Sequence, residues 1–147
     1  MQKKTIRDID VNGKRILLRV DYNVPMNNGR ITDDTRIRAT LPTINYLLKE
    51  KARVVLCTHL GRPGGKIVDE LRLSPIAERL AGLVTKTGVI YIQESSGEHA
   101  AATISALQPG GLALLENIRF EPGEEQNDIE FTKSLAKLAD IFVNDAL

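Results

Sequence analysis

The chain has 147 residues, of which 42% are hydrophobic and 27% charged; this is the composition of a soluble globular protein and the length of one domain. Its formal net charge of +1 and its 4% aromatic content argue against a nucleic-acid binder, because the chain offers neither a global positive field nor base-stacking surfaces. The single cysteine excludes an internal disulfide. The absence of a long apolar run and of a signal-peptide core predicts a cytoplasmic protein with no membrane partner.

The first predicted strand is the apolar run Arg15–Val20, and a helical pattern follows it. Apolar residues recur on one helical face across residues 37–48, and Asp33 or Asp34 can cap the start of this helix and complement its dipole. Pro42 falls inside the pattern, where proline removes a backbone hydrogen bond, so we expect either a kink or a later helix start.

The second predicted strand is Arg53–Cys57. We interpret Cys57 as a buried structural thiol, with a reactive thiol as the alternative. The next helix is predicted to have Ser74 as its N-cap, with a proline at its first position, and to end before Gly88. The third predicted strand, Val89–Ile92, comes directly after it.

The last part of the chain continues the alternation, with a short helix at Glu98–Leu107, a strand at Gly111–Glu116, a helix that begins at Asp128 and a strand at Ile141–Asn144. No predicted strand alternates cleanly between apolar and polar residues, which is typical of a parallel sheet covered on both faces. The order therefore predicts a single α/β domain with a three-layer, doubly wound parallel β-sheet of the Rossmann-like class.

Three long irregular stretches begin where predicted strands end, at Asp21–Thr32, His59–Leu73 and Ile118–Asn127. In a parallel sheet the carboxyl ends of the strands meet at one edge, and ligands bind there. Long loops inside a compact domain also tend to be functional. We therefore expect the binding site at this edge of the sheet.

Polar and basic side chains gather at the predicted edge. The candidate binding residues are Asp21, Asn23, Arg36, His59, Arg62 and Arg119. Arginine binds carboxylate or phosphate through two parallel hydrogen bonds, and histidine titrates near neutral pH and can donate to either group. Three guanidinium groups beside one imidazole therefore predict a small anionic ligand that carries both a phosphate and a carboxylate.

Each candidate also has an interpretation that needs no ligand. Asp21 can be a turn residue, Arg36 an exposed helix arginine and His59 an ordinary loop histidine. Arg119 can pair with the glutamates that follow it. Only the shared position at one edge favours a site.

Other chemistries find less support. The sequence has no Walker-type phosphate loop, no G-x-G-x-x-G after the first strand and no G-x-S-x-G. Two histidines and one cysteine make no closed zinc site, and we interpret His99 as solvated surface. We therefore expect no metal ligand in this chain.

Five motifs in order resemble the phosphoglycerate kinase family, from Met1 to about Ala146. They are Arg19-Val20-Asp21-Tyr22-Asn23-Val24-Pro25, Thr58-His59-Leu60-Gly61-Arg62-Pro63, Asp69-Glu70-Leu71-Arg72-Leu73-Ser74-Pro75, Leu115-Glu116-Asn117-Ile118-Arg119-Phe120 and Val143-Asn144-Asp145-Ala146. The resemblance implies a two-domain kinase whose N-terminal half binds 3-phosphoglycerate and whose C-terminal half binds Mg-ATP or ADP. It also implies that the six candidates bind substrate and that Arg36 helps to stabilise the transferring phosphoryl group.

The family continues past the Asn144-Asp145-Ala146 motif with a further substrate-binding arginine, and it usually has phenylalanine where Leu147 stands. Residues 1–147 are therefore expected to form a substrate-binding domain that is incomplete at its C-terminal end, with the nucleotide-binding domain absent. We expect this chain alone to bind 3-phosphoglycerate weakly or not at all, to bind no nucleotide and to transfer no phosphoryl group. Family members are usually monomeric, whereas an uncovered sheet edge or helix face favours self-association.

Two alternatives stay open. One is an anion-binding or folding fragment with no activity of its own, and the other is an enzyme that acts on a different small phosphorylated acid.

Overall fold

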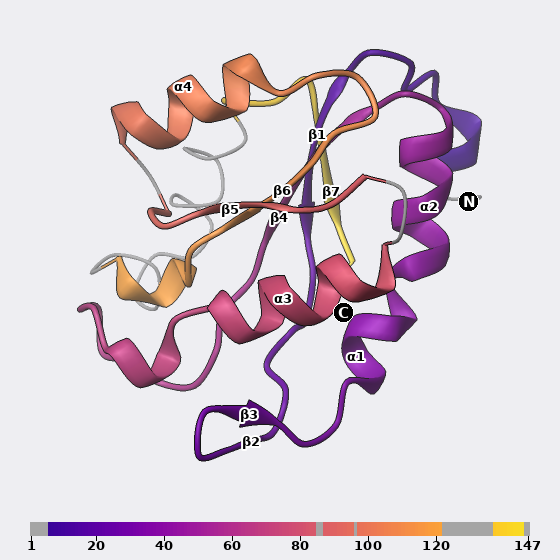
Figure 1. The fold of residues 1–147 in the computed structure, drawn as a ribbon. Helices are drawn as coiled ribbons and strands as arrows, with labels where there is room; N and C mark the ends of the chain where they lie inside the picture. Colours follow the sequence, from indigo (N-terminus) through magenta and orange to yellow (C-terminus); the bar gives the residue numbers. More distant parts are fainter. Residues whose placement is uncertain (1–5, 85–86, 96, 122–136, 146–147) are drawn as a thin grey trace, which may run out of the picture.

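The computed structural model describes residues 6–84, 87–95, 97–121 and 137–145 (Figure 1). Its main feature is a five-stranded sheet in the order β5-β6-β4-β1-β7, in which every pair of neighbours is parallel. The strands are β1 (Arg15–Arg19), β4 (Arg53–Cys57), β5 (Ile90–Ile92), β6 (Leu112–Leu115) and β7 (Ile141–Asn144). All five predicted strands are confirmed, each to within one residue at its ends.

Helices cover both faces of the sheet, because successive side chains of a strand point to opposite sides. Ile16 and Leu18 of β1 pack in one cluster with α2 (Leu41–Lys49) and α3 (Ser74–Leu83). Leu17, between them, packs in a second cluster with α4 (Glu98–Ala106). Figure 1 shows α4 on one side of the sheet, with α2 and α3 on the other. The three-layer, doubly wound fold is confirmed, and Cys57 is buried in the second cluster.

The helix predicted across residues 37–48 is two helices, α1 (Thr35–Ala39) and α2, which meet at Thr40. Pro42 lies in the first turn of α2, where its missing N–H costs no intrahelical bond. The N-cap prediction for α3 is wrong by one residue, since Leu73 takes that position and Ser74 begins the helix. Most of the helix predicted from Asp128 lies outside the described residues.

A short antiparallel hairpin of β2 (Met26–Asn27) and β3 (Arg30–Ile31) lies within the loop after β1, which was predicted to be irregular. Its turn residues, Asn28 and Gly29, have φ angles of 53° and 76°. Asn-Gly is the dipeptide that tight hairpin turns favour, so the sequence contained the signal that the prediction missed. In Figure 1 the hairpin lies beyond the carboxyl end of β1.

No helix within the described ranges is long and apolar enough to cross a membrane. Strand β7 forms one edge of the sheet, and its Phe142 side chain is 36% exposed. Self-association through this edge stays a prediction.

Candidate functional site

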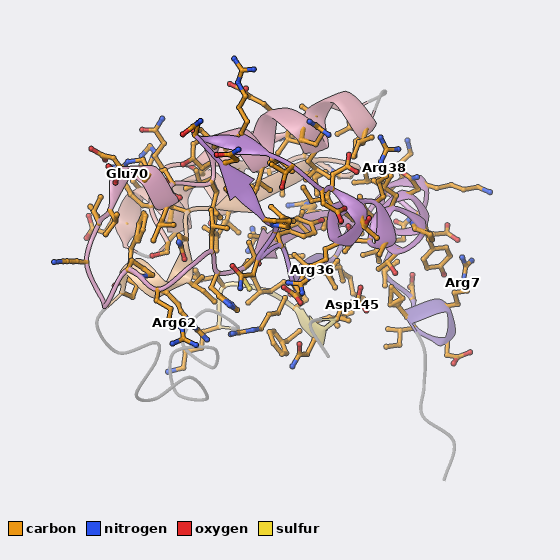
Figure 2. All side chains as sticks on the ribbon, turned by 90° about the horizontal axis from the view of Figure 1, so that it is seen from below. Arg7, Arg36, Arg38, Arg62, Glu70 and Asp145 are labelled. Atoms are coloured by element: carbon orange, nitrogen blue, oxygen red, sulfur yellow. The ribbon has the colours of Figure 1, made fainter. Side chains whose placement is uncertain are left out.

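The carboxyl ends of β6, β4, β1 and β7 lie side by side at one edge of the sheet, and Figure 2 looks onto this edge. The segment 21–23 follows β1, the loop 58–73 follows β4, and Asn117 and Arg119 follow β6. Arg36 comes from α1, between the hairpin and α2. The topology therefore brings the candidate residues to a common edge from segments up to about a hundred positions apart.

Arg36 is bound to the segment that follows β1. Its Nη1 donates to Asp21 Oδ1 at 3.2 Å and to the carbonyl oxygen of Asn23 at 2.7 Å. The Arg36 and Asp21 side chains are 52% and 42% exposed, so this ion pair contributes little to stability. Asp21 Oδ1 also accepts from the backbone N–H of Asn23 at 3.1 Å. Asp21 is therefore both the predicted turn residue and a partner of Arg36.

Asn23 connects this segment to the loop after β4. Its Oδ1 accepts from the backbone N–H of Gly61 at 3.0 Å. Gly61 has a φ angle of 64°, and a Cβ there would lie 2.8 Å from the Leu71 side chain, so the position favours glycine. The bond places Arg62, the next residue, beside the segment that holds Arg36. Figure 2 shows the Arg62 side chain on this face, to the left of Arg36.

The loop after β4 is also bound to the segment after β6. Gly65 N–H donates to the carbonyl oxygen of Arg119 at 3.2 Å, and Ile118 N–H donates to that of Thr58 at 3.1 Å. His59 and Arg119 are half-buried and Arg62 is exposed. The structure thus brings Asp21, Asn23 and Arg36 into direct contact, and it links Arg62 and Arg119 to them through the backbone.

Asn117 is a residue of this edge that the sequence did not single out. Its side chain is fully buried, at 0% exposure. Its Oδ1 accepts from the N–H groups of Leu60 at 3.3 Å and Arg119 at 3.1 Å. Its Nδ2 donates to the carbonyl oxygens of Leu60 at 2.8 Å and Leu71 at 3.0 Å. One side-chain amide therefore holds both ends of the loop after β4 against the segment that follows β6.

Glu116, also overlooked, is a carboxylate with only 2% exposure. It accepts from Leu73 N–H at 2.9 Å, from Arg72 Nη1 at 3.3 Å and from the Tyr91 hydroxyl. Burial raises the pKa of Tyr91, and the Glu116 carboxylate raises it further, so this hydroxyl stays a donor. Because these partners satisfy the buried charge, we interpret Glu116 as the support that holds the start of α3 to β6.

Asp34 directly precedes α1. It accepts from Arg38 Nε at 3.0 Å and from Arg79 Nη1 at 2.8 Å, and so joins α1 to α3. These two bonds hold the pKa of Asp34 below its usual value. Of the two predicted caps, Asp34 takes the N-cap position of α1 but makes no side-chain capping bond. Asp33, one residue earlier, accepts through Oδ1 from Thr35 N–H at 2.8 Å, and the bonding with Thr35 lowers the pKa of Asp33.

We expect both aspartates to make the free energy of unfolding fall in acid. Each carboxyl has a lower pKa in the folded chain than in the unfolded chain, where the pKa is near 3.8. Such a group stabilises the fold at a pH above its unfolded pKa, and this contribution is lost as the pH falls through the folded pKa. We expect the free energy of unfolding, measured in urea, to drop below about pH 4. Asp34→Asn should flatten this drop relative to the exposed control Glu50→Gln. An equally steep drop in both variants would contradict the assignment.

A shallow hollow adjoins Arg36, lined by Asn23, Val24, Pro25, Asp33, Thr35 and Arg36. Both bonds of Arg36 to described residues use Nη1, so Nε and Nη2 can donate to a ligand there. Among the residues the structure describes, no group of three or more His, Cys, Asp or Glu side chains could hold a metal ion. No magnesium ligand is therefore assigned to them.

Comparison with known proteins matches this chain to one family. The family model described as phosphoglycerate kinase matches residues 6–147. The chain is 54% identical over 146 residues to a phosphoglycerate kinase of Pelotomaculum thermopropionicum, which covers 99% of this chain and 37% of that protein. It is 53% identical over 143 residues to that of Thermomicrobium roseum, covering 97% of the chain and 36% of the relative.

Solved structures agree with the sequences. The phosphoglycerate kinase of Coxiella burnetii matches with a TM-score of 0.83 and 41% identity, over 96% of this chain and 34% of that one. That of Pyrococcus horikoshii OT3 matches with a TM-score of 0.82 and 37% identity, over 96% and 36%. The chain thus spans little more than a third of the length of these relatives, at most 37%.

Proposed function

Because the chain belongs to the phosphoglycerate kinase family, we propose that it supplies the 3-phosphoglycerate half of a site for reversible phosphoryl transfer between ATP and the carboxylate of that substrate. The reaction interconverts these two with 1,3-bisphosphoglycerate and ADP. The observation that carries the proposal is the contact of Asp21, Asn23 and Arg36 with one another and, through Gly61, with the loop of Arg62.

The substrate has a phosphate at one end and a carboxylate at the other, which suits a surface that presents separated guanidinium groups. Arg62, Arg119 and His59 are proposed to bind its anionic groups through charge-assisted hydrogen bonds. Asp21 and Asn23 are proposed to accept from its hydroxyl group and to orient Arg36. The substrate carboxylate is already a nucleophile, so positioning and positive charge are the main requirements of the reaction.

Arg36 is proposed to stabilise the phosphoryl group during transfer. Its described bonds leave Nε and Nη2 for the negative charge that develops on the equatorial oxygens. Among the described residues, no group of three or more His, Cys, Asp or Glu side chains could hold a metal ion, and magnesium and the nucleotide are proposed to bind elsewhere. We place their binding in the part of the relatives that this chain does not match, with residues 1–147 as an incomplete substrate-binding domain.

The proposal is tested by titrating the 147-residue polypeptide with 3-phosphoglycerate and following backbone amide signals by NMR. We expect weak, saturable shifts at the carboxyl edge of the sheet. Arg62→Ala and Arg119→Ala should each weaken binding about ten-fold or more, because each removes charge-assisted hydrogen bonds. Arg30→Ala, on the exposed strand β3, makes the same charge change and should have little effect.

The alternatives give different outcomes. An equal loss in all three variants would indicate a general electrostatic effect and contradict a defined half-site. Tighter binding of a different phosphorylated acid would favour another substrate. No saturable shift for any phosphorylated acid would favour a fragment without a ligand.

A further inference from the structure

Tyr22 stands between the two residues that hold Arg36, yet it lies wholly within the core, at 0% exposure. Its hydroxyl lies 2.6 Å from Thr40 Oγ1. Thr40 Oγ1 in turn donates to the carbonyl oxygen of Ile37 at 2.7 Å. Because this bond uses the only hydroxyl proton of Thr40, Tyr22 must be the donor to Thr40. Burial raises the pKa of Tyr22, so the donor proton is retained.

This buried hydroxyl pair joins the segment 21–23 to the end of α1. Thr40 directly follows α1, and Arg36 lies on that helix. Arg36 also reaches the segment from its own side, through Asp21 Oδ1 and the carbonyl oxygen of Asn23. The same three residues therefore hold α1 at two points. A helix of five residues is too short to be stable alone, so its position depends on such contacts.

The segment 21–23 is bound just as closely to the loop after β4. The backbone N–H of Tyr22 donates to Thr58 Oγ1 at 2.9 Å, one residue before His59. Asn23 Oδ1 accepts from Gly61, one residue before Arg62. A displacement of Tyr22 would thus change the distance between Arg36 and the loop that carries His59 and Arg62.

We infer that Tyr22 and Thr40 are positioning residues, whose buried hydroxyl pair sets the place of Arg36 relative to Arg62 for a substrate with a phosphate and a carboxylate. The inference rests on the proposed function for its substrate, but its geometric part concerns Arg36 alone. A displacement of about 1 Å in a reacting group can cost on the order of a hundred-fold in rate. A pair of hydroxyl groups remote from the ligand can therefore matter to binding and transfer.

The experiment uses Tyr22→Phe and Thr40→Val, which keep the side-chain shapes and remove the bond, and Thr40→Ser, which keeps the hydroxyl. Two quantities are measured: the NMR signals of the Arg36 guanidinium without ligand, and the dissociation constant for 3-phosphoglycerate. Ile104→Val, in the cluster on the α4 face, is the control for a modest loss of core packing.

We expect Tyr22→Phe and Thr40→Val to shift and broaden the Arg36 signals and to raise the dissociation constant about ten-fold, with the double variant no worse than either one. Thr40→Ser should stay within about two-fold of wild type, and Ile104→Val should change stability without changing binding. Unchanged Arg36 signals in both Tyr22→Phe and Thr40→Val would overturn the inference, whether or not the ligand binds. Wild type that fails to bind while these signals respond would contradict substrate binding by this half-site alone and leave the positioning role standing.

Discussion

Replacing Asn117 by alanine is expected to lower the free energy of unfolding by about 3–5 kcal/mol. The amide makes four hydrogen bonds from a fully buried position, to Leu60 N–H, Leu60 carbonyl, Leu71 carbonyl and Arg119 N–H. Alanine cannot replace any of them, so buried backbone groups would lose their partners. Each such group costs about 1–3 kcal/mol when no water reaches it. The loss is a large part of the 5–15 kcal/mol that typical domains have in total.

Urea unfolding monitored by circular dichroism measures this change. Asn45→Ala, an exposed asparagine of α2, is the matched control and should stay within about 0.5 kcal/mol of wild type. Hydrogen exchange adds a local test, since the amides of Leu60 and Arg119 should lose protection well before those of β4. A loss below about 1 kcal/mol, with both amides still protected, would show that the loop does not depend on Asn117.

The second large effect concerns the reaction. A polypeptide of these 147 residues is expected to show no phosphoryl transfer from ATP to 3-phosphoglycerate, at a rate lower than that of a full-length relative by about 10⁵-fold or more. The reason is that the proposed half-site can orient one substrate only. Bringing two reactants together in a fixed geometry accounts for effective concentrations of about 10⁵–10⁸ M in well-oriented reactions. Without a group that holds the nucleotide, that contribution is missing.

A coupled assay of ADP formation, at substrate concentrations far above those that saturate a full-length relative, gives the measurement. The Arg36→Ala variant separates true activity from contamination, because a contaminating kinase would be present equally in both preparations. Turnover that increases with the concentration of the wild-type chain and disappears in Arg36→Ala would contradict the prediction. It would show that these residues bind and orient ATP by themselves.

The strands were predictable because burial on both faces leaves a local trace. The part of β4 at residues 54–57 must be apolar along its whole length because helices cover both sides of it, and this pattern is visible in four consecutive residues. Pro42 likewise indicated a break in its helix, because the backbone consequences of proline are local. The hairpin at Asn28-Gly29 had an equally local signal, and it was missed because the whole stretch had been assigned to a loop.

The supports of the candidate site were not predictable in the same way. Asn117 and Leu71 are 46 positions apart, and Glu116 and Leu73 are 43 apart. No periodicity or spacing reveals that such residues meet, because their contact depends on the strand order β6-β4-β1. Asn117 and Glu116 are the most buried of these polar residues and make several hydrogen bonds each, yet nothing in the sequence distinguished them from ordinary polar residues.

By itself, the sequence determined the α/β class, the five strands, the edge at which polar residues gather and the resemblance to one family, because each of these depends on local patterns or on ordered motifs. Only the tertiary structure decided that Arg36 binds Asp21 and the Asn23 carbonyl, that Tyr22 reaches Thr40 in the core, and that one buried amide holds the loop of Arg62. These contacts join segments whose proximity is created by parallel strand pairing. The physical reason is that a buried polar group needs hydrogen-bond partners, and these partners can come from distant parts of the chain. The residues next to it in the sequence do not indicate which distant groups will lie beside it.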